Sequence, residues 1–464
     1  MTTASQFGHL WGRGHETFTP SLRRILSIKG EMATTFLQGL VTSDLTQDPI
    51  APKGHINAEM DLPEDDPLVV FNPNLRTTCF LDNRGRIVTD AFLWKMTERN
   101  ENNDQHYLID VPSNSANALM DHLQKYKLRR TRVTVSDVSD KVSSHVFYGT
   151  LNASGPPPGY TVGLDPRHPS MGVRVISTEH PVDHFPSLIA KGFPDCPGTY
   201  NVLRKFTGIA EGIELKGKTA LETNQEWLNA VSFHKGCYLG QELTARSQFT
   251  GVIRKRIMPL LLIDTRTEVP RPWVLAHHMQ ENPLAKLKEE LKIQTPLPNL
   301  SSPSVGALLT MLAMGSIVPP KNNRAYEGTD TDTDDQENEK EKDATIKLEQ
   351  EMQEFVDELH DGISSESSAT KIIDTVDNKT IGQIVSAPAP GTSILLAQMR
   401  LDRVGFSNNG KTPWSRLNKV RLGNMKKEYR YLPYTPLWWP IIDTKTGKAR
   451  EPEEEAVEEN EGMS

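Results

Sequence analysis

One octapeptide, K-G-C-Y-L-G-Q-E at residues 235–242, combines the residue types that thiol chemistry needs. Cys237 follows Lys235 and stands between Gly236 and Gly240. A thiol acts as a nucleophile or a metal ligand in its thiolate form, which a nearby cation or a helix N-terminus stabilises. Glycines free the backbone for unusual conformations and let a partner approach closely. The pattern predicts an open loop that presents a reactive Cys237, with Lys235 helping to keep the thiol ionised.

The octapeptide also contains Tyr238, Gln241 and Glu242. Gln241 and Glu242 begin a segment, residues 241–246, that is expected to be a helix or a turn. Their side chains are expected to shape the loop or to bind a partner.

The chain contains three cysteines, which lie far apart and form no C-x-x-C pair. This spacing argues against a disulfide framework and a self-contained zinc site, and it favours a reducing compartment. Cys79 falls in a strand-like run, where a buried side chain is expected. Cys196 is expected to be an incidental loop thiol. Cys237 is therefore the candidate for thiol chemistry.

Charge is distributed unevenly along the 464 residues, whose net charge is -8. Residues 327–361 carry fifteen acids against three lysines, and residues 451–464 carry seven acids and no Lys or Arg. The rest of the chain is basic, which favours an anionic ligand, an acidic partner or nucleic acid. The longest apolar stretch, residues 305–318, is too short to cross a bilayer, so no membrane insertion is expected.

Hydrophobic periodicity predicts two α+β units followed by a divided β domain. In the first unit we expect a helix over residues 115–126 and strands over residues 23–28, 68–71, 77–81, 87–94 and 107–111. A second unit of short strands and a helix follows. Strand-like runs then occur at 253–263, 380–387 and 393–401. The acidic segment between them is too charged and too poor in apolar residues to offset its ordering entropy, and we expect it to be disordered.

The segment around the octapeptide, S-F-H-K-G-C-Y-L-G-Q-E-L-T-A-R at 232–246, closely resembles the signature of the mitochondrial iron-sulfur cluster assembly factors related to the glycine-cleavage T-protein. Bacterial folate-binding regulators of tRNA modification share the octapeptide. The resemblance covers most of residues 18–260 and part of 375–405, but neither the acidic insertion nor the tail. Further matching segments are F-L-Q-G-L-V-T-S-D at 36–44, L-D-N-R-G-R at 81–86, D-P-R at 165–167, G-I-A-E-G-I at 208–213, I-G-Q-I at 381–384 and L-L-A-Q-M-R-L at 395–401.

This resemblance implies an α+β fold of the T-protein type, a ring of α+β subdomains around a central folate-type pocket with a C-terminal β-barrel. The expected parts are a short presequence or disordered segment at 1–17, an N-terminal α+β domain at 18–138, a second α+β domain at 139–250 that ends in the octapeptide loop, a barrel domain at 251–440 with a largely disordered acidic insertion at about 266–372, and an acidic tail at 441–464.

The resemblance also implies a function: maturation of mitochondrial [4Fe-4S] proteins, including aconitase-type and lipoate-synthesis enzymes. An iron-sulfur cluster normally takes about four protein ligands, mostly thiolates. Cys237 cannot hold a cluster alone, so it would share a transient cluster with A-type scaffold proteins, which bring their own cysteines. The expected location, the mitochondrial matrix, rests on the resemblance, because residues 1–17 are compatible with only a short presequence.

Two alternatives remain. A folate-dependent aminomethyl or one-carbon transferase would bind tetrahydrofolate, with Asp90 as a folate contact. That family has two adjacent aspartates where this chain has Thr89-Asp90, so the acid/base role is in doubt and a non-catalytic assembly factor is favoured. The other alternative is a regulator of tRNA modification with Cys237 as a redox thiol. It is less favoured, because the Pro-rich residues 431–440 suit packing against the barrel better than contact with nucleic acid.

Overall fold

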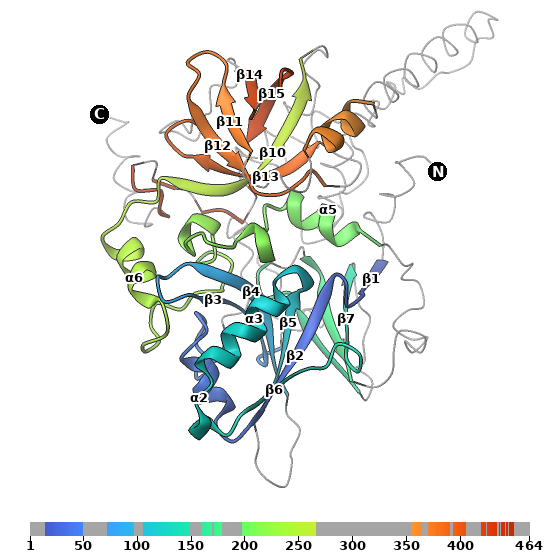
Figure 1. The fold of residues 1–464 in the computed structure, drawn as a ribbon, viewed down its shortest axis with the longest axis vertical. Coiled ribbons are helices and arrows are strands. Elements are labelled where there is room, and N and C mark those ends of the chain that lie inside the picture. The colour runs from blue at the N-terminus through green and yellow to red at the C-terminus, as the bar shows by residue number, and fades with distance from the viewer. Residues whose placement is uncertain are drawn as a thin grey trace, which may run out of the picture.

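The fold combines antiparallel sheets with a closed barrel in a computed structural model (Figure 1). It describes residues 14–49, 72–96, 105–148, 159–168, 171–178, 197–265, 354–363, 370–389, 393–404 and 419–449, the last range without residues 424, 434–435, 437, 441 and 444. Cys196, residues 266–353 and residues 450–464 lie outside these ranges.

A five-stranded sheet in the order β3-β4-β5-β2-β6 forms the N-terminal unit. The short helix α2 (Ala33–Gln38) and the amphipathic helix α3 (Ser113–Tyr126) share an apolar cluster with it. The expected helix over 115–126 and four of the expected strands are thus present, with ends shifted by a few residues, whereas the strand expected over 68–71 lies outside the described residues. The strands are β2 (Arg23–Gly30), β3 (Leu75–Leu81), β4 (Ile87–Met96), β5 (Gln105–Pro112) and β6 (Thr134–Asp137).

A four-stranded sheet in the order β1-β7-β9-β8 forms the second unit. Its strands are β1 (Gly14–Phe18), β7 (Ser143–Tyr148), β8 (Tyr160–Leu164) and β9 (Val173–Ser177).

Strand β1 corrects the expectation of a presequence or disordered segment for residues 14–17, because it begins at Gly14 and pairs with β7. Residues 1–13 lie outside the described residues. The strand was missed because one of its two buried residues, Glu16, is charged, and only the other, Phe18, is apolar. The Glu16 carboxylate accepts hydrogen bonds from the backbone N–H groups of Gly198 (3.0 Å) and Tyr200 (2.8 Å) at the start of helix α5 (Thr199–Phe206). An inward-facing acid hides the strand from a search for apolar alternation.

The C-terminal unit is a closed six-stranded barrel, which confirms the divided β domain expected from the sequence. β10 pairs with both β13 and β15. Around the barrel, the strands run β10 (Lys255–Asp264), β13 (Ile394–Arg400), β12 (Thr380–Ile384), β11 (Lys371–Asp374), β14 (Lys419–Leu422) and β15 (Glu428–Pro433).

A helix over residues 354–362 corrects part of the expectation of a largely disordered insertion at 266–372. Phe355, Val356 and Leu359 lie on one side of this helix and are buried in the apolar cluster of the barrel. Their helical spacing buries an apolar stripe, although the surrounding segment is acidic overall. Composition averaged over the insertion concealed this local pattern.

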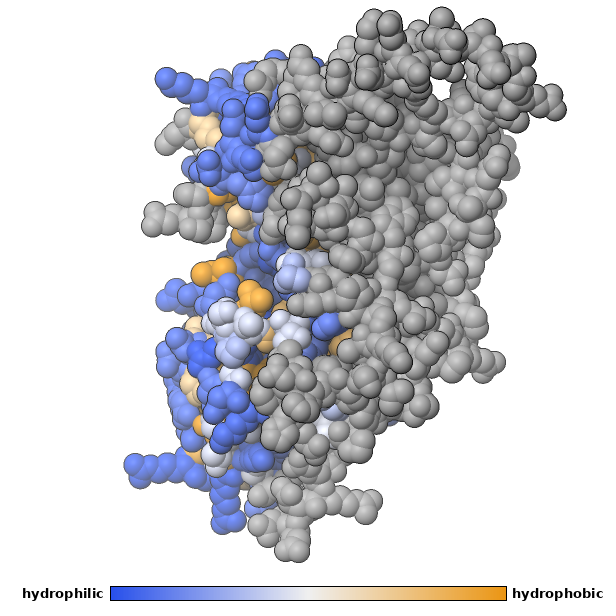
Figure 2. Space-filling view, turned by 90° about the vertical axis from the view of Figure 1, so that its right-hand side faces the viewer, coloured by the Kyte–Doolittle hydropathy of each residue, from blue (hydrophilic) through white to orange (hydrophobic). Residues whose placement is uncertain are grey.

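The units meet through α5 and the irregular segments that follow it, which lie between the barrel and the sheets in Figure 1. Helix α6 (Gln241–Phe249) flanks this layer at the tip of the β3–β4 hairpin. Figure 2 shows the side opposite α6, where the described surface is mainly hydrophilic with small separate groups of hydrophobic residues. Among the described residues, no helix is long and apolar enough to cross a membrane.

Candidate functional site

The octapeptide forms a loop that leads into α6, and the structure places the Cys237 thiol at its exposed part. Gly236 is also exposed, whereas the neighbours on either side, Lys235 and Tyr238, are buried. A Cβ atom added to Gly236 would meet nothing within 4 Å. The Cys237 thiol is therefore exposed, with open space beside the backbone of Gly236. The buried side chains of Lys235 and Tyr238 hold the loop to the rest of the protein.

Lys235 anchors the loop to the N-terminal unit. Its Nζ atom donates hydrogen bonds to the backbone carbonyl oxygens of Gln38 (2.8 Å), Val41 (2.7 Å) and Ser43 (2.9 Å). Burial lowers the pKa of Lys235 to about 8, an effect that the charge of Asp44 opposes. An ammonium group has three N–H donors, and these three carbonyls use all of them. These contacts give Lys235 an anchoring role, and its expected role in keeping the thiol ionised stays a prediction.

Gly240 fixes the other end of the loop against the β3–β4 hairpin. It has φ +78°, a left-handed conformation that favours glycine, and it precedes the first residue of α6. A Cβ atom on Gly240 would lie 2.4 Å from the carbonyl oxygen of Asp82 and 2.9 Å from the Cα atom of Gly85. Two of the segments that carried the family resemblance are therefore in direct backbone contact.

The residues after Gly240 begin helix α6. The backbone N–H of Gln241 donates to the carbonyl of Tyr238 (3.2 Å), and its side chain is half-buried. Glu242 is exposed in the first turn of α6, where a negative charge is favoured by the helix dipole. Gln241 thus belongs to the closure of the loop, and Glu242 remains available to a partner.

Cys79, by contrast, lies in the interior of β3. Its Sγ atom donates to Gln225 Oε1 at 3.4 Å, and burial, assisted by the charge of Asp90, holds the pKa of the thiol well above its ordinary value. It is a buried structural cysteine, as the sequence predicted.

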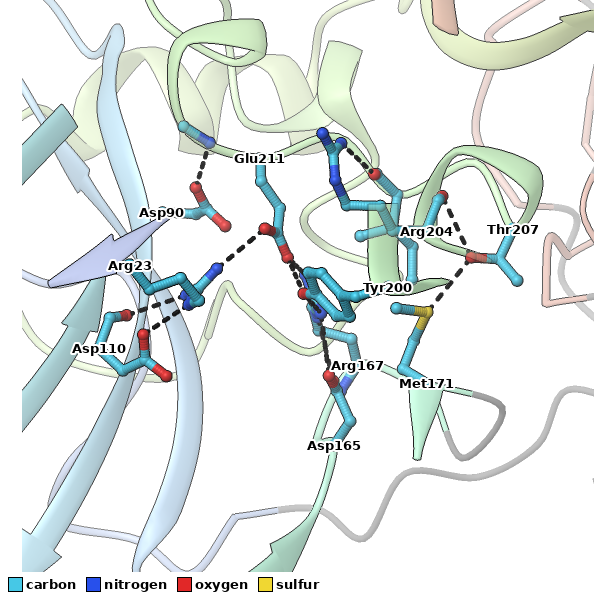
Figure 3. A network of polar contacts seen from close by, with 12 residues as sticks. Arg23, Asp90, Asp110, Asp165, Arg167, Met171, Tyr200, Arg204, Thr207 and Glu211 are labelled. Carbon is cyan, nitrogen blue, oxygen red and sulfur yellow. Dashed lines mark hydrogen bonds and ion pairs between the residues drawn. The ribbon is translucent and has the colours of Figure 1, made fainter. Parts of the chain in front are cut away.

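A buried network of charged groups lies at the junction of the two sheets and the segment after α5 (Figure 3). Arg23 binds Asp110 (2.5 Å) and Glu211 (2.9 Å), and Arg167 binds Glu211 (2.5 Å) and Asp165 (2.9 Å). Burial alone would raise the pKa of Glu211, but Arg167 and Arg23 hold it well below its ordinary range. The network joins the five-stranded sheet to the segment after β8 and to the segment after α5.

Aromatic rings surround this network. The guanidinium groups of Arg174, Arg167 and Arg23 lie 4.0, 4.6 and 5.2 Å from the centre of the Phe92 ring. The Tyr200 hydroxyl donates to Glu211. Such stacking stabilises arginine charges that are removed from water.

Asp90, the candidate folate contact, lies at the edge of the network. Its Oδ1 atom accepts a hydrogen bond from the Gly212 backbone N–H at 2.7 Å, and Oδ2 has no hydrogen-bond partner among the described residues. Burial, and then the charge of Glu211, raise the pKa of Asp90 to about 6 against the opposing effects of Gly212 and the arginines. Asp90 is therefore poised to gain or lose a proton near neutral pH.

The carboxylates of this region fit a folate only in part. A carboxylate recognises a pteridine by accepting two adjacent N–H donors, one at each oxygen. Both oxygens of Glu211 are already engaged, by Arg23 on one side and by Arg167 and Tyr200 on the other. Asp90 offers one oxygen. The arrangement matches a structural network better than a pteridine site.

Sequence reasoning missed most of this network. Asp165, Arg167 and Glu211 lie inside the matched segments D-P-R and G-I-A-E-G-I, and a search of those segments for charged partners could have found them. Arg23 gave no signal, because its partners come from distant parts of the chain.

Comparison with known proteins gives relatives for about half of the chain. No family model matches. The iron-sulfur cluster assembly factor IBA57 homolog, mitochondrial, of Aspergillus fumigatus is 34% identical over 266 residues, covering 52% of this chain and 56% of the relative. The protein of the same name from Mycosarcoma maydis is 31% identical over 255 residues, covering 53% and 57%. The chain thus spans somewhat more than half the length of these curated relatives.

Among solved structures, the glycine cleavage system aminomethyltransferase T from Bartonella henselae has a similar fold. The TM-score is 0.50 at 10% sequence identity, and the alignment covers 96% of this chain and 90% of that one. At this identity the likeness concerns the fold alone, and it confirms the T-protein-like architecture expected from the sequence. The chain is therefore IBA57-like, a relative of the mitochondrial iron-sulfur cluster assembly factors built on a T-protein-like fold.

Proposed function

We propose that the protein assists the maturation of [4Fe-4S] proteins in the mitochondrial matrix, with Cys237 as one ligand of a cluster that a second protein holds. A-type scaffold proteins are the proposed partners, and aconitase-type and lipoate-synthesis enzymes are the proposed recipients. The observation that supports this most directly is the exposed Cys237 thiol on a loop held at Lys235 and Gly240.

The number of ligands argues for a shared site. A cluster takes about four ligands, and Cys237 supplies one. The described residues contain no group of three or more His, Cys, Asp or Glu arranged to hold a metal ion. The partner would supply the other thiolates, and the open space beside Gly236 would let its cluster approach the thiol.

The second candidate is a folate-dependent aminomethyl or one-carbon transferase. It is favoured by one observation, the buried Asp90 carboxyl whose pKa of about 6 suits acid/base chemistry. The engagement of both Glu211 oxygens opposes it. Assays with tetrahydrofolate and a lipoyl-bound aminomethyl substrate separate the candidates: activity that survives Cys237→Ser but not Asp90→Asn would favour the transferase.

Reconstitution tests the assembly proposal. The purified protein, an A-type scaffold, iron and sulfide are mixed, and the complex is isolated for its visible absorption spectrum. We expect a cluster spectrum from the complex that is lost with Cys237→Ser and retained with His234→Ala, a change at an exposed neighbour of the loop. Circular dichroism checks that both variants fold. An identical spectrum with Cys237→Ser would show that the thiol is not a ligand.

A further inference from the structure

A dense run of cations, which we call the basic turn, follows the last residues of helix α3. Residues 125–132 read K-Y-K-L-R-R-T-R, and no other window of eight described residues carries five basic side chains. Between Asp121 and Asp137 the chain contains no acid, and Asp137 is itself paired with Arg24. The density of one sign of charge therefore sets the basic turn apart from the scattered cations elsewhere on the described surface.

The basic turn is folded against the end of the five-stranded sheet. Its 3-10 helix η3 (Arg129–Thr131) is closed by the Thr131 backbone N–H, which donates to the Leu128 carbonyl at 3.0 Å. Arg132 follows with a φ of +45°, and a Cβ atom on Gly30, the last residue of β2, would collide with the Arg132 carbonyl oxygen. Figure 1 shows α3 running away from the barrel toward this end of the molecule. The turn is thus an ordered feature of the fold.

The side chains of the basic turn face solvent. Leu128, in the middle of the run, is 52% exposed. Lys127 is half-buried, and the other four basic residues are exposed, namely Lys125, Arg129, Arg130 and Arg132. The surface therefore presents an aliphatic side chain with cations before and after it in the sequence.

The helix dipole of α3 explains only part of this run. Cations at the end of a helix stabilise it, and Lys125 lies in the last turn of α3 while Lys127 is its C-cap residue. The three arginines lie beyond the helix. Their one ion pair with a described residue, Arg132 with Glu31 at 3.6 Å, is exposed to solvent and therefore weak. The dipole also gives no reason for the exposure of Leu128.

These features suit the surface of an anionic bilayer. Anionic headgroups attract clustered cations, and an apolar side chain among the cations enters the boundary between headgroups and acyl chains. RNA, by contrast, is bound through rings on which its bases stack. Tyr126, the one aromatic residue of the turn, is half-buried, and its ring packs against His122, with 4.9 Å between ring centres. The turn therefore offers charge and an exposed leucine rather than an exposed ring.

We propose that the basic turn, with Leu128 at its centre, binds the surface of anionic phospholipid bilayers without crossing them. The net charge of -8 on the whole chain opposes such binding, so attraction requires a place where cations are concentrated. Binding through this end of the molecule leaves the barrel directed away from the bilayer (Figure 1). The inference does not depend on the proposed cluster chemistry.

Vesicle flotation with the full chain tests the binding. The vesicles contain phosphatidylcholine alone or with about 30 mol% phosphatidylglycerol, whose charge sets the surface potential. We expect the protein to float with the anionic vesicles alone at about 0.05 M salt, and to be released in about 1 M NaCl, where the Debye length falls to about 3 Å. No flotation with anionic vesicles, or equal flotation with neutral ones, would overturn the proposal.

Two double variants with the same change of net charge test the location. Arg129→Gln/Arg130→Gln removes two cations of the basic turn, and Arg254→Gln/Lys255→Gln removes two exposed cations near the barrel. Each cation at an anionic surface contributes a factor of about five, so the first variant should bind the anionic vesicles at least about tenfold more weakly and the second less than about twofold. Circular dichroism checks that both fold. Equal losses would show that binding is not located at the turn.

A Leu128→Gln variant separates a bilayer from other polyanions, because it keeps every charge. We expect it to bind the anionic vesicles at least about threefold more weakly, since a half-exposed leucine gains from burial among acyl chains. Wild-type affinity in this variant would overturn the proposal, because negative charge alone would then be recognised. Displacement of the wild type from vesicles by a charge-equivalent amount of transfer RNA or polyglutamate would overturn it in favour of a nucleic acid or an acidic protein.

Discussion

The Cα atom of Gly85 lies 2.9 Å from the position that a Cβ atom on Gly240 would occupy. These glycines belong to the β3–β4 hairpin and to the octapeptide, and both have positive φ angles, +76° and +78°. The loop that presents Cys237 can close on the hairpin only because neither residue has a side chain. This contact between distant segments explains why glycine stands at both position 85 and position 240.

This contact predicts different effects for the two glycines of the octapeptide. Gly240→Ala introduces a left-handed alanine and a clash with the Asp82 carbonyl, so it should reduce the free energy of unfolding by about 2 to 4 kcal/mol. Gly236→Ala adds a methyl group to open space, and its effect should stay within about 0.5 kcal/mol. Urea unfolding followed by circular dichroism measures both. Equal losses for the two variants would contradict the contact.

Much of the fold could be predicted from the sequence because its signals are local. The run of strand-forming residues in β4 and the helical apolar stripe of α3 need no knowledge of the rest of the chain. Strand β1 was missed because Glu16 faces inward toward the start of α5, and the helix over 354–362 because acidic neighbours dominate the composition around it.

The candidate site could be predicted only in part for a related reason. The glycines beside Cys237 indicated an open loop, whereas the partners of Lys235 are backbone carbonyls near α2, which any residue type provides. The anchoring role of Lys235 could therefore not be predicted from the types of the residues around it.

Replacing Lys235 with methionine should destabilise the protein. The change removes three hydrogen bonds and leaves the buried carbonyls of Gln38, Val41 and Ser43 without these donors. Each buried unsatisfied group costs about 1 to 3 kcal/mol, and partial relaxation should leave a loss of about 2 to 5 kcal/mol. The exposed Lys216→Met variant is the matched control, with little change expected. Hydrogen exchange should also show faster opening of the loop in Lys235→Met alone. Protection equal to that of the wild type would contradict the anchoring role.

Replacing Glu211 with glutamine should disrupt the buried network. The change leaves Arg23 and Arg167 without one of their anionic partners in the interior, and breaking a buried pair from one side costs about 3 to 5 kcal/mol. The exposed pair formed by Arg400 and Asp402 provides the comparison, because solvent screens it and Asp402→Asn should hardly move the unfolding midpoint. Urea unfolding of the three proteins measures the difference. A Glu211→Gln variant as stable as Asp402→Asn would show that the network contributes no net stability.

The titration of Asp90 predicts that its contribution to folding stability falls as the pH rises, whereas that of an ordinary paired carboxylate increases. Its folded pKa is raised to about 6 from the ordinary value of 3.8, so between these values the folded protein binds more protons at this site than the unfolded chain. The contribution of Asp90 to stability is therefore fully present below about pH 4 and is lost as the pH rises to about 6, by up to about 3 kcal/mol.

The Asp90→Asn variant isolates this effect, because it leaves the other titrating groups in place and removes only the carboxyl. As the pH rises from about 4 to about 6, the wild type should become progressively less stable relative to Asp90→Asn, and the difference should level off above that range. Urea unfolding of both proteins at a series of pH values gives the difference directly. A constant difference across the range would mean that Asp90 titrates alike in the folded and unfolded chains, and it would remove the one observation that favours acid/base chemistry at this residue.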